Sequence, residues 1–300
     1  MLYSFAMIKA PCLTTMKSVC VYNLFVVALL MGCGGCQKTT DPVVGPAVSD
    51  SVRVARQTIK ELISPSQPSR LEEETVVVEG QSYRVGTVQQ SSYSYDKQGR
   101  ILTEYNQYFG ASSMTERTDS IYYEYVGSAV NIRRVALNTV PKRVTTQRLA
   151  LDSRGFAEKQ PTIFVATYDA KGYLLALRDE YGRTVARIEN GNVLELSVST
   201  SPSTPTYIFR NTYDLTKAGL PSIQPIYGKP SRNLVIETAI DRDNFYSIDK
   251  NVYKTTYWYK YDQYNRIVRQ IARSIEGVAL YEFGDNTIRA TDFSYVSSPR

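Results

Sequence analysis

Hydrophobic positions follow three patterns along the chain, and each pattern predicts a different kind of segment. Near the N-terminus, apolar residues form an unbroken run over residues 24–30. Over residues 51–63 they recur at spacings of three and four, which is typical of an amphipathic helix. Beyond about residue 75, polar and apolar residues alternate over short stretches, as in half-buried strands. The sequence therefore predicts an N-terminal signal, one short helix and an all-β domain.

The predicted helix covers about residues 51–63. Its apolar stripe consists of Val52, Ala55, Ile59, Leu62 and Ile63. Ser49, Asp50 or Ser51 can each serve as its N-cap, and Pro65 ends the pattern. We expect this helix to pack its stripe against the strands that follow.

A motif of the form Tyr-Asp-x-x-Gly recurs in the region of alternating residues. It occurs at residues 95–101 and 168–174, with variants at 151–156 and 261–267. The Asp side chain accepts a backbone N–H bond two residues on, and the last position needs positive φ, which suits Gly and then Asn. Such units are type I turns with a G1 bulge between antiparallel strands. The predicted turn residues are Asp96, Gly99, Asp152, Gly155, Asp169, Gly172, Asp262 and Asn265.

The alternation in the predicted strands is imperfect, because polar and apolar residues fall on both faces. Such strands suit a twisted sheet that is partly solvated on each side, or a small barrel with a partly polar interior. We predict consecutive antiparallel hairpins over about residues 75–295, forming a strongly curled sheet or a barrel-like domain, since closure removes exposed edges. A membrane-spanning barrel is not expected, because strands such as residues 178–180 supply no lipid-facing apolar band.

The N-terminal apolar run belongs to a segment with the anatomy of a secretory signal. It follows Lys9 and Lys17, no acidic residue precedes Asp41, and Leu30-Met31-Gly32-Cys33 closes it. This closing motif resembles the lipobox of bacterial lipoproteins, in which the Cys becomes the acylated N-terminus. The resemblance implies lipidation of Cys33. Cys36, which follows Cys-Gly-Gly, fits the motif less well.

These features predict a signal over residues 1–32, a lipidated stem over 33–49 and one domain over 50–300. We expect translation to start at Met16, which gives the signal a more usual length. The stem is polar and contains Pro, as a tether does. Two or three acyl chains on one Cys would hold the protein at a membrane. We expect the outer membrane, with the periplasmic or surface face left open.

The amino-acid composition excludes several kinds of catalytic and metal-binding site. The chain has no His, which excludes Ser-His-Asp, Cys-His and His-based zinc sites. Loss of the signal lowers the net charge from +6 to +4, because 33 basic and 29 acidic residues remain. No Lys/Arg block indicates a nucleic-acid partner. Cys36 is the only Cys that is neither removed nor lipidated, so the domain is expected to fold without a disulfide.

The hairpin units resemble the YD repeats of RHS-type proteins. The wider pattern includes Leu220-Pro221, residues 227–234 and Tyr261-Asp262. It is similar to a family of uncharacterised bacterial lipoproteins with a domain of unknown function and a porin-like β fold. The resemblance covers about residues 80–285 and implies the hairpin architecture. It assigns no catalytic residue.

Three segments are candidates for function. Tyr257, Trp258 and Tyr259 offer aromatic rings to a glycan or a partner protein, although cross-strand packing is the alternative. Residues 220–234 are predicted to form a long loop, an excursion that crosses the sheet, and long loops often contain functional residues. Residues 241–244 contain oxygen donors, but they lack the Gly and Glu of a calcium loop, so we predict neither a metal nor a cofactor.

The combined expectation is a lipid-anchored, non-enzymatic envelope protein that binds a glycan, a peptide or a partner protein through its β surface. No catalytic residue is predicted. Two alternatives stay open. One is a structural or assembly scaffold of the envelope, and the other is a hydrolase that uses Asp and Glu carboxylates.

Overall fold

The structure is a computed structural model of the chain, and it describes residues 52–63, 71–110, 115–138, 141–158, 164–198, 207–229, 231–242, 252–276 and 287–297. These residues form sixteen strands and one 3₁₀ turn, which confirms the all-β class. The elements are β1 (Val52–Leu62), β2 (Leu71–Val78), β3 (Gln81–Tyr95), β4 (Ile101–Phe109), β5 (Thr115–Val126), β6 (Ala129–Ala136), β7 (Arg143–Ala150), β8 (Val165–Tyr168), β9 (Leu174–Arg178), β10 (Ala186–Glu189), β11 (Asn192–Val198), β12 (Tyr207–Ala218), η1 (Pro225–Tyr227), β13 (Asn233–Arg242), β14 (Val252–Tyr261), β15 (Ile267–Glu276) and β16 (Thr287–Ser297).

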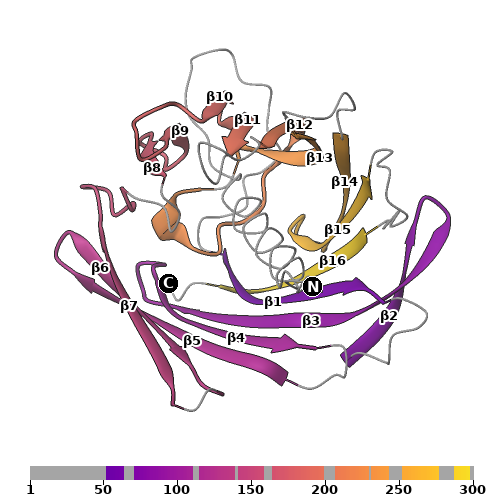
Figure 1. Cartoon of the computed structure of the whole chain (residues 1–300), viewed down its shortest axis with the longest axis horizontal. Helices are drawn as coiled ribbons and strands as arrows, with labels where there is room; N and C mark the ends of the chain where they lie inside the picture. Colours follow the sequence, from indigo (N-terminus) through magenta and orange to yellow (C-terminus); the bar gives the residue numbers. More distant parts are fainter. Residues whose placement is uncertain are drawn as a thin grey trace, which may run out of the picture.

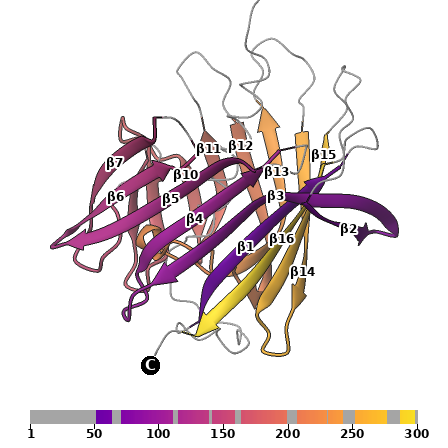
Figure 2. The ribbon, with the colours of Figure 1, turned by 90° about the horizontal axis from the view of Figure 1, so that it is seen from below.

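Fourteen strands belong to one antiparallel sheet. Its order is β10-β11-β12-β13-β14-β15-β16-β1-β3-β4-β5-β6-β7, with β2 paired to β3, while β8 and β9 form a separate hairpin. Most neighbours are consecutive in the chain, as expected for hairpins, but β16 returns to pair with β1. In Figure 1, β10–β13 lie on one side of the molecule and β1, β3, β4 and β5 on the other. Figure 2 shows β6 and β7 at the opposite flank from β14, β15 and β2.

The predicted strong curl or closure of the sheet is not found. Within the described residues the strand order has two ends, β7 and β10, and no ladder joins them. Between these two ends lie the separate β8–β9 hairpin and isolated contacts, such as the backbone hydrogen bonds from Glu158 N to Ala150 O and from Ala166 N to Glu158 O. The expectation failed because closure is only one way to protect an edge. Arg143 and Arg148 place positive charge on β7, which discourages pairing with the same edge of a second copy.

The predicted helix over residues 51–63 is wrong, because Val52–Leu62 form β1 in the middle of the sheet. This strand pairs with β16 on one edge and with β3 on the other. Both of its faces are covered, and Gln57, Thr58, Ile59 and Lys60 are buried in succession. A strand covered on both faces loses its period of two. Long-range pairing therefore outweighed the weak local preference for a helix.

The Tyr-Asp-x-x-Gly units form tight turns. Gly99, Gly155, Gly172 and Asn265 have φ values of 77°, 87°, 87° and 59°. In the first unit the Asp96 carboxylate accepts the backbone N–H groups of Gln98 and Arg100, both at 2.9 Å.

The structure contains a fifth turn of the same kind, which the motif did not predict. Asp179 accepts the backbone N–H groups of Tyr181 and Arg183, and Gly182 has a φ of 79°. Of residues 178–180, which were expected to lie in a strand, Arg178 ends β9, whereas Asp179 and Glu180 belong to the turn. The unit does not match the motif, because Arg178 precedes its Asp where the other units have Tyr or Leu. The turn depends on the Asp and the Gly rather than on the residue before them.

Candidate functional site

The connection between β12 and β13, residues 219–232, packs on one face of the main sheet, which we call the inner face. Its Ile223, Ile226 and Tyr227 are buried. Ile223 belongs to the apolar cluster that contains Val54 and Phe293, whereas Ile226 and Tyr227 join a cluster that includes Ile101 and Tyr123. The segment expected to be an excursion is therefore a packed element of the fold. We call it the packed connection.

A polar network runs across the inner face of β3, β4 and β5. Buried Ser91 donates to Asn106 Oδ1 at 2.5 Å, and the Asn106 amide donates to Glu104 Oε1 at 2.7 Å. Glu104 Oε2 accepts from Tyr123 Oη at 3.3 Å and from Gln224 Nε2 at 2.8 Å. Gln224 belongs to the packed connection, so the network ties that segment to the sheet.

Burial keeps the tyrosines of this network in their neutral, donating form. Desolvation, reinforced by the charge of nearby Glu104, raises the pKa of Tyr93 and of Tyr123 well above the ordinary value. Tyr93 Oη donates to Gln57 Oε1 at 3.1 Å. At neutral pH these phenols donate hydrogen bonds and do not act as bases. The network therefore supplies fixed donors and acceptors.

Next to this network, Asp119 of β5 is fully buried and lies opposite Asn106 in the strand register. Its Oδ2 accepts from Arg117 Nη2 at 2.7 Å and from Arg134 Nε at 3.2 Å. Burial alone would raise the pKa of Asp119, but the two guanidinium groups outweigh it and lower this pKa below its ordinary value. Asp119 Oδ1 has no hydrogen-bond partner. We call Arg117, Asp119 and Arg134 the Arg-Asp-Arg cluster.

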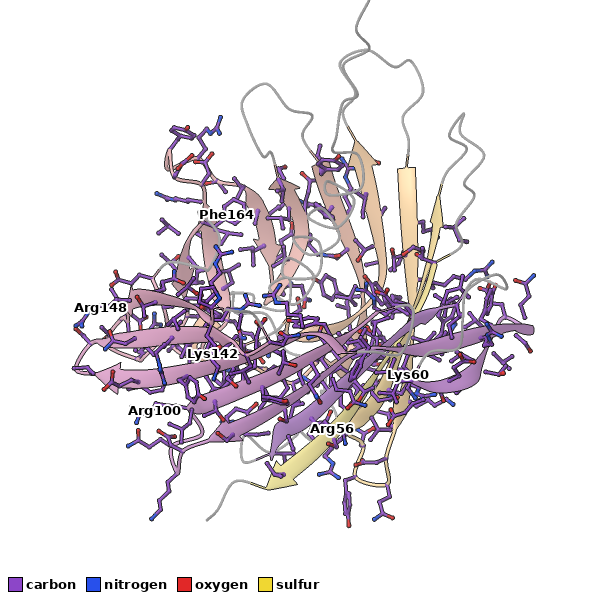
Figure 3. All side chains as sticks on the ribbon, turned by 60° about the horizontal axis from the view of Figure 1, so that its bottom comes forward. Arg56, Lys60, Arg100, Lys142, Arg148 and Phe164 are labelled. Atoms are coloured by element: carbon purple, nitrogen blue, oxygen red, sulfur yellow. The ribbon has the colours of Figure 1, made fainter. Side chains whose placement is uncertain are left out.

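On the opposite, outer face, β2 covers part of β15 and β16. Val76 and Val78 pack in a cluster with Ile271, Ile288 and Ala290. Beside this cluster, Glu74 accepts from Lys60 Nζ at 3.0 Å and from Arg269 Nη2 at 2.8 Å. Arg269 also donates to Asp292 at 2.5 Å. We call Lys60, Glu74, Arg269 and Asp292 the outer charge network. Figure 3 labels Lys60 of this network and, elsewhere on the sheet, Arg56 and Arg148.

The three aromatic residues predicted as a ligand surface are divided between the two faces. Trp258 is partly buried and packs on the apolar cluster beneath β2. Tyr259 Oη donates to Val235 O at 2.6 Å and accepts from Gln270 Nε2 at 3.1 Å. Burial raises the pKa of Tyr257, its neighbour on the same strand face. The three side chains do not form one surface, and ligand binding by any of them stays a prediction.

The structure adds no support for a site at the other predicted features. Asp241 forms an ion pair with Arg210, while Asp243 and Cys33 lie outside the described residues. In the described ranges, no group of three or more Cys, Asp or Glu side chains is placed to hold a metal ion. The same ranges contain no helix with the length and hydropathy needed to cross a membrane.

The fold has a counterpart among solved structures. No family model matches the chain, and no curated protein matches its sequence. A porin-like protein from Bacteroides uniformis is similar in structure, with a TM-score of 0.50 and 15% identity over 81% of this chain and 98% of that one. At this identity the similarity shows the fold alone. It agrees with the porin-like β fold that the sequence resemblance implied.

Proposed function

We propose that this protein is a lipid-anchored envelope protein that binds a glycan on its inner face and catalyses no reaction. The main support for this proposal is the polar network on β3–β5. Its hydroxyl, amide and carboxylate groups sit on adjacent strands, and Ser91 and Asn106 are held by bonds to one another. Groups of this kind match sugar hydroxyls, which donate and accept hydrogen bonds at the same atom. Strands also hold such groups more rigidly than loops do.

The acylated Cys33 would provide membrane attachment in this proposal. The outer face of the sheet is a poor lipid contact, because Ser92, Ser94, Tyr105 and Glu124 point outward and are exposed. A lipid-facing sheet would need an apolar band at these positions. An envelope location, at the outer membrane, is also consistent with the porin-like structural neighbour.

A binding role is favoured over a hydrolase by the state of the inner carboxylates. Glu104 accepts three hydrogen bonds from Asn106, Tyr123 and Gln224. Asp119 is held ionised by two arginines. A general acid needs a raised pKa and a reachable proton, and Asp119 has neither.

One observation favours a scaffold role as a second candidate. Within the described residues β7 forms a ladder only with β6, and residues 143–148 are exposed along the strand. Such an edge can accept a strand from another protein. Replacement of Val144 by Pro would block that pairing, and loss of a stable envelope complex in this variant would favour the scaffold.

Two measurements test the main proposal. Cys33→Ala should release the protein from membranes or leave the precursor uncleaved, whereas Cys36→Ala should behave as wild type. The full-length protein in detergent should bind oligosaccharides in calorimetric titrations. Asn106→Ala should weaken that binding about tenfold, while Thr103→Ala on the other face of β4 should not. Absence of binding to any glycan would refute the proposed ligand class.

A further inference from the structure

Strand β7 has an open edge along most of its length. Within the described residues it forms a ladder only with β6, and Val144, Thr146 and Arg148 are all exposed. An unpaired edge presents a row of backbone N–H and C=O groups that another strand can use. The edge therefore offers a backbone surface to an extended peptide.

The register identifies which backbone groups of β7 point outward. Leu151 N donates to Ser128 O at 2.9 Å, and these two residues continue the register in which β6 pairs with β7. Hydrogen-bonded and non-hydrogen-bonded pairs alternate in an antiparallel ladder, so the odd-numbered residues of β7 bond β6. The backbone groups of Val144, Thr146 and Arg148 therefore point away from β6.

The chain itself uses one end of this edge. Glu158 N donates to Ala150 O at 3.1 Å, and Leu151 forms an antiparallel bridge with Ala157. These contacts agree with the alternation, because Ala150 is the next even-numbered residue. They also show that the space beside β7 accepts an antiparallel segment at this end. Another strand would continue the same ladder along residues 144–148.

The β6–β7 hairpin is strongly basic. Residues 129–150 contain five basic residues and no acidic one. The remainder of the chain beyond residue 32 holds 28 basic and 29 acidic residues, so the positive surplus of that part lies on this hairpin. Arg133, Lys142 and Arg148 are exposed, and none of the three forms an ion pair within the described residues. The edge is thus complementary to an acidic partner.

Two of these cations lie on the outer face of the hairpin, beside the outward backbone groups. The register places Arg133 beside Thr146 and Asn131 beside Arg148. Glu124 of β5 lies on the same face, but β6 separates it from the edge strand. A strand added to β7 would lie about 4.8 Å away, and an acidic side chain opposite Thr146 would be a diagonal neighbour of Arg148.

We infer that the β7 edge binds an extended acidic segment of another protein, which adds to the sheet as an antiparallel strand with its carboxylates toward Arg148 and Arg133. This inference rests on the scaffold candidate of the proposed function and does not depend on glycan binding. A second copy of this chain would bring arginines against arginines at the same edge. A neutral strand would make the backbone bonds but would gain nothing from the charges of the hairpin.

The test uses full-length protein in detergent and three labelled nine-residue peptides, in which Thr alternates with Glu, Gln or Lys. Fluorescence anisotropy should show that the Glu peptide binds about fivefold or more tightly than the Gln peptide, and that the Lys peptide does not bind measurably. Raising the salt concentration should reduce the preference for the Glu peptide. Gln has the size of Glu without its charge, so this pair isolates the electrostatic contribution.

Hydrogen exchange, resolved to single residues by mass spectrometry, tests strand addition itself. In the free protein the outward amides of Val144, Thr146 and Arg148 should exchange rapidly, and the Glu peptide should slow them. The amides of Thr145 and Gln147, which bond β6, are the internal reference. Slow exchange of the three outward amides before any peptide is added would show that the chain itself covers the edge, and would overturn the inference.

Variants separate the backbone contribution from the charge. Val144→Pro removes an outward N–H without removing a bond to β6, and it should weaken binding of the Glu peptide about tenfold. Arg148→Glu should reverse the preference, so that the Lys peptide binds more tightly than the Glu peptide. Arg187→Glu is the matched control, because Arg187 is exposed on β10, at the other end of the strand order, and it should leave the preference unchanged. If Val144→Pro does not fold, Arg148→Glu and hydrogen exchange decide.

The outcomes are distinct. Equal binding of the three peptides with slowed edge exchange would overturn the inference and leave the scaffold candidate intact. Binding of the Glu peptide that leaves exchange unchanged, or that persists in folded Val144→Pro, would show adsorption to a basic surface and would overturn strand addition. If none of the peptides binds, the scaffold role of this edge fails together with the inference, while glycan binding is judged by its own titration.

Discussion

The inner face of β3–β5 and the outer face beneath β2 both bury polar groups, but they do so differently. In the outer charge network two cations, Lys60 and Arg269, meet two anions, Glu74 and Asp292, at 2.5–3.7 Å. On the inner face, the two arginines of the Arg-Asp-Arg cluster share a single carboxylate oxygen. Glu104, nearby, is held by neutral donors only.

This difference indicates a separate role for each network. Buried charges that are all matched hold two elements in one arrangement, and here they hold β2 on the sheet. The Nε of Arg273 is unmatched on that side too, but its guanidinium bonds Glu79 at 2.5 Å. In the Arg-Asp-Arg cluster, Asp119 Oδ1 has no hydrogen-bond partner within the described residues. Both networks are therefore expected to contribute to stability, and binding is expected on the inner face.

The largest effect on stability is expected from Arg269→Ala. This change leaves Glu74 and Asp292 facing each other with only Lys60 between them. Removal of one member of a fully buried ionic network typically costs 3–5 kcal/mol. This network is partly buried, so we expect a smaller loss, of about 2 kcal/mol, in the free energy of unfolding. Urea denaturation measures it. The control Arg148→Ala, on exposed β7, should change that free energy by less than about 0.5 kcal/mol. Similar effects of the two changes would contradict the stabilising role of the outer network.

Acid should weaken both faces. The pKa values of Asp119 and Glu74 lie below their ordinary values. Each group therefore stabilises the folded state above its unfolded pKa of about 4, and this contribution is lost as the pH falls through the lower, folded pKa. The free energy of unfolding should fall steeply below about pH 4. Asp119→Asn should be less stable than wild type at pH 7 and should lose less on acidification. An unchanged acid profile in this variant would show that its ion pairs contribute nothing.

A smaller effect is expected from Gln224→Ala, which removes the bond from the packed connection to Glu104. One hydrogen bond to a charged group contributes about 1.5–3 kcal/mol, and the lower end applies because Tyr123 and Asn106 still bond this carboxylate. Limited proteolysis within residues 219–232 should become faster. Gln98→Ala, in an exposed turn, serves as the control. Equal cleavage rates in the two variants would mean that apolar packing and the other hydrogen bonds, such as that from Tyr95 Oη to Ile223 O, retain the connection without Gln224.

The smallest effect is expected from removal of metal ions or from reduction. The chain has no His, and its only Cys residues are Cys12, Cys20, Cys33 and Cys36, all before the described residues. EDTA and dithiothreitol should leave the melting temperature unchanged within about one degree. A fall of several degrees with EDTA alone would point to a site made of oxygen ligands, and Asp241 with Asp243 would be examined first.

Local sequence was sufficient wherever a few neighbouring residues decide the backbone. Asp262 and Asn265 define a turn because the carboxylate and the positive φ lie within four residues of each other. The all-β class follows in the same way from repeated turns and short alternating stretches. The Arg-Asp-Arg cluster was not predicted, although Arg117 and Asp119 are two residues apart and share a strand face. Arg134 joins this cluster from the next strand, and no local pattern links it to Asp119.

Contacts between distant segments were decided only by the tertiary structure. β1 is a strand because β16, more than two hundred residues later in the chain, supplies its hydrogen bonds. Glu104 and Gln224 are 120 residues apart, and Glu74 and Arg269 are 195 apart. Such pairs depend on strand order and register, which are set by the burial of many side chains at once. Hydrophobic spacing reports which positions prefer burial, but not which segment buries them.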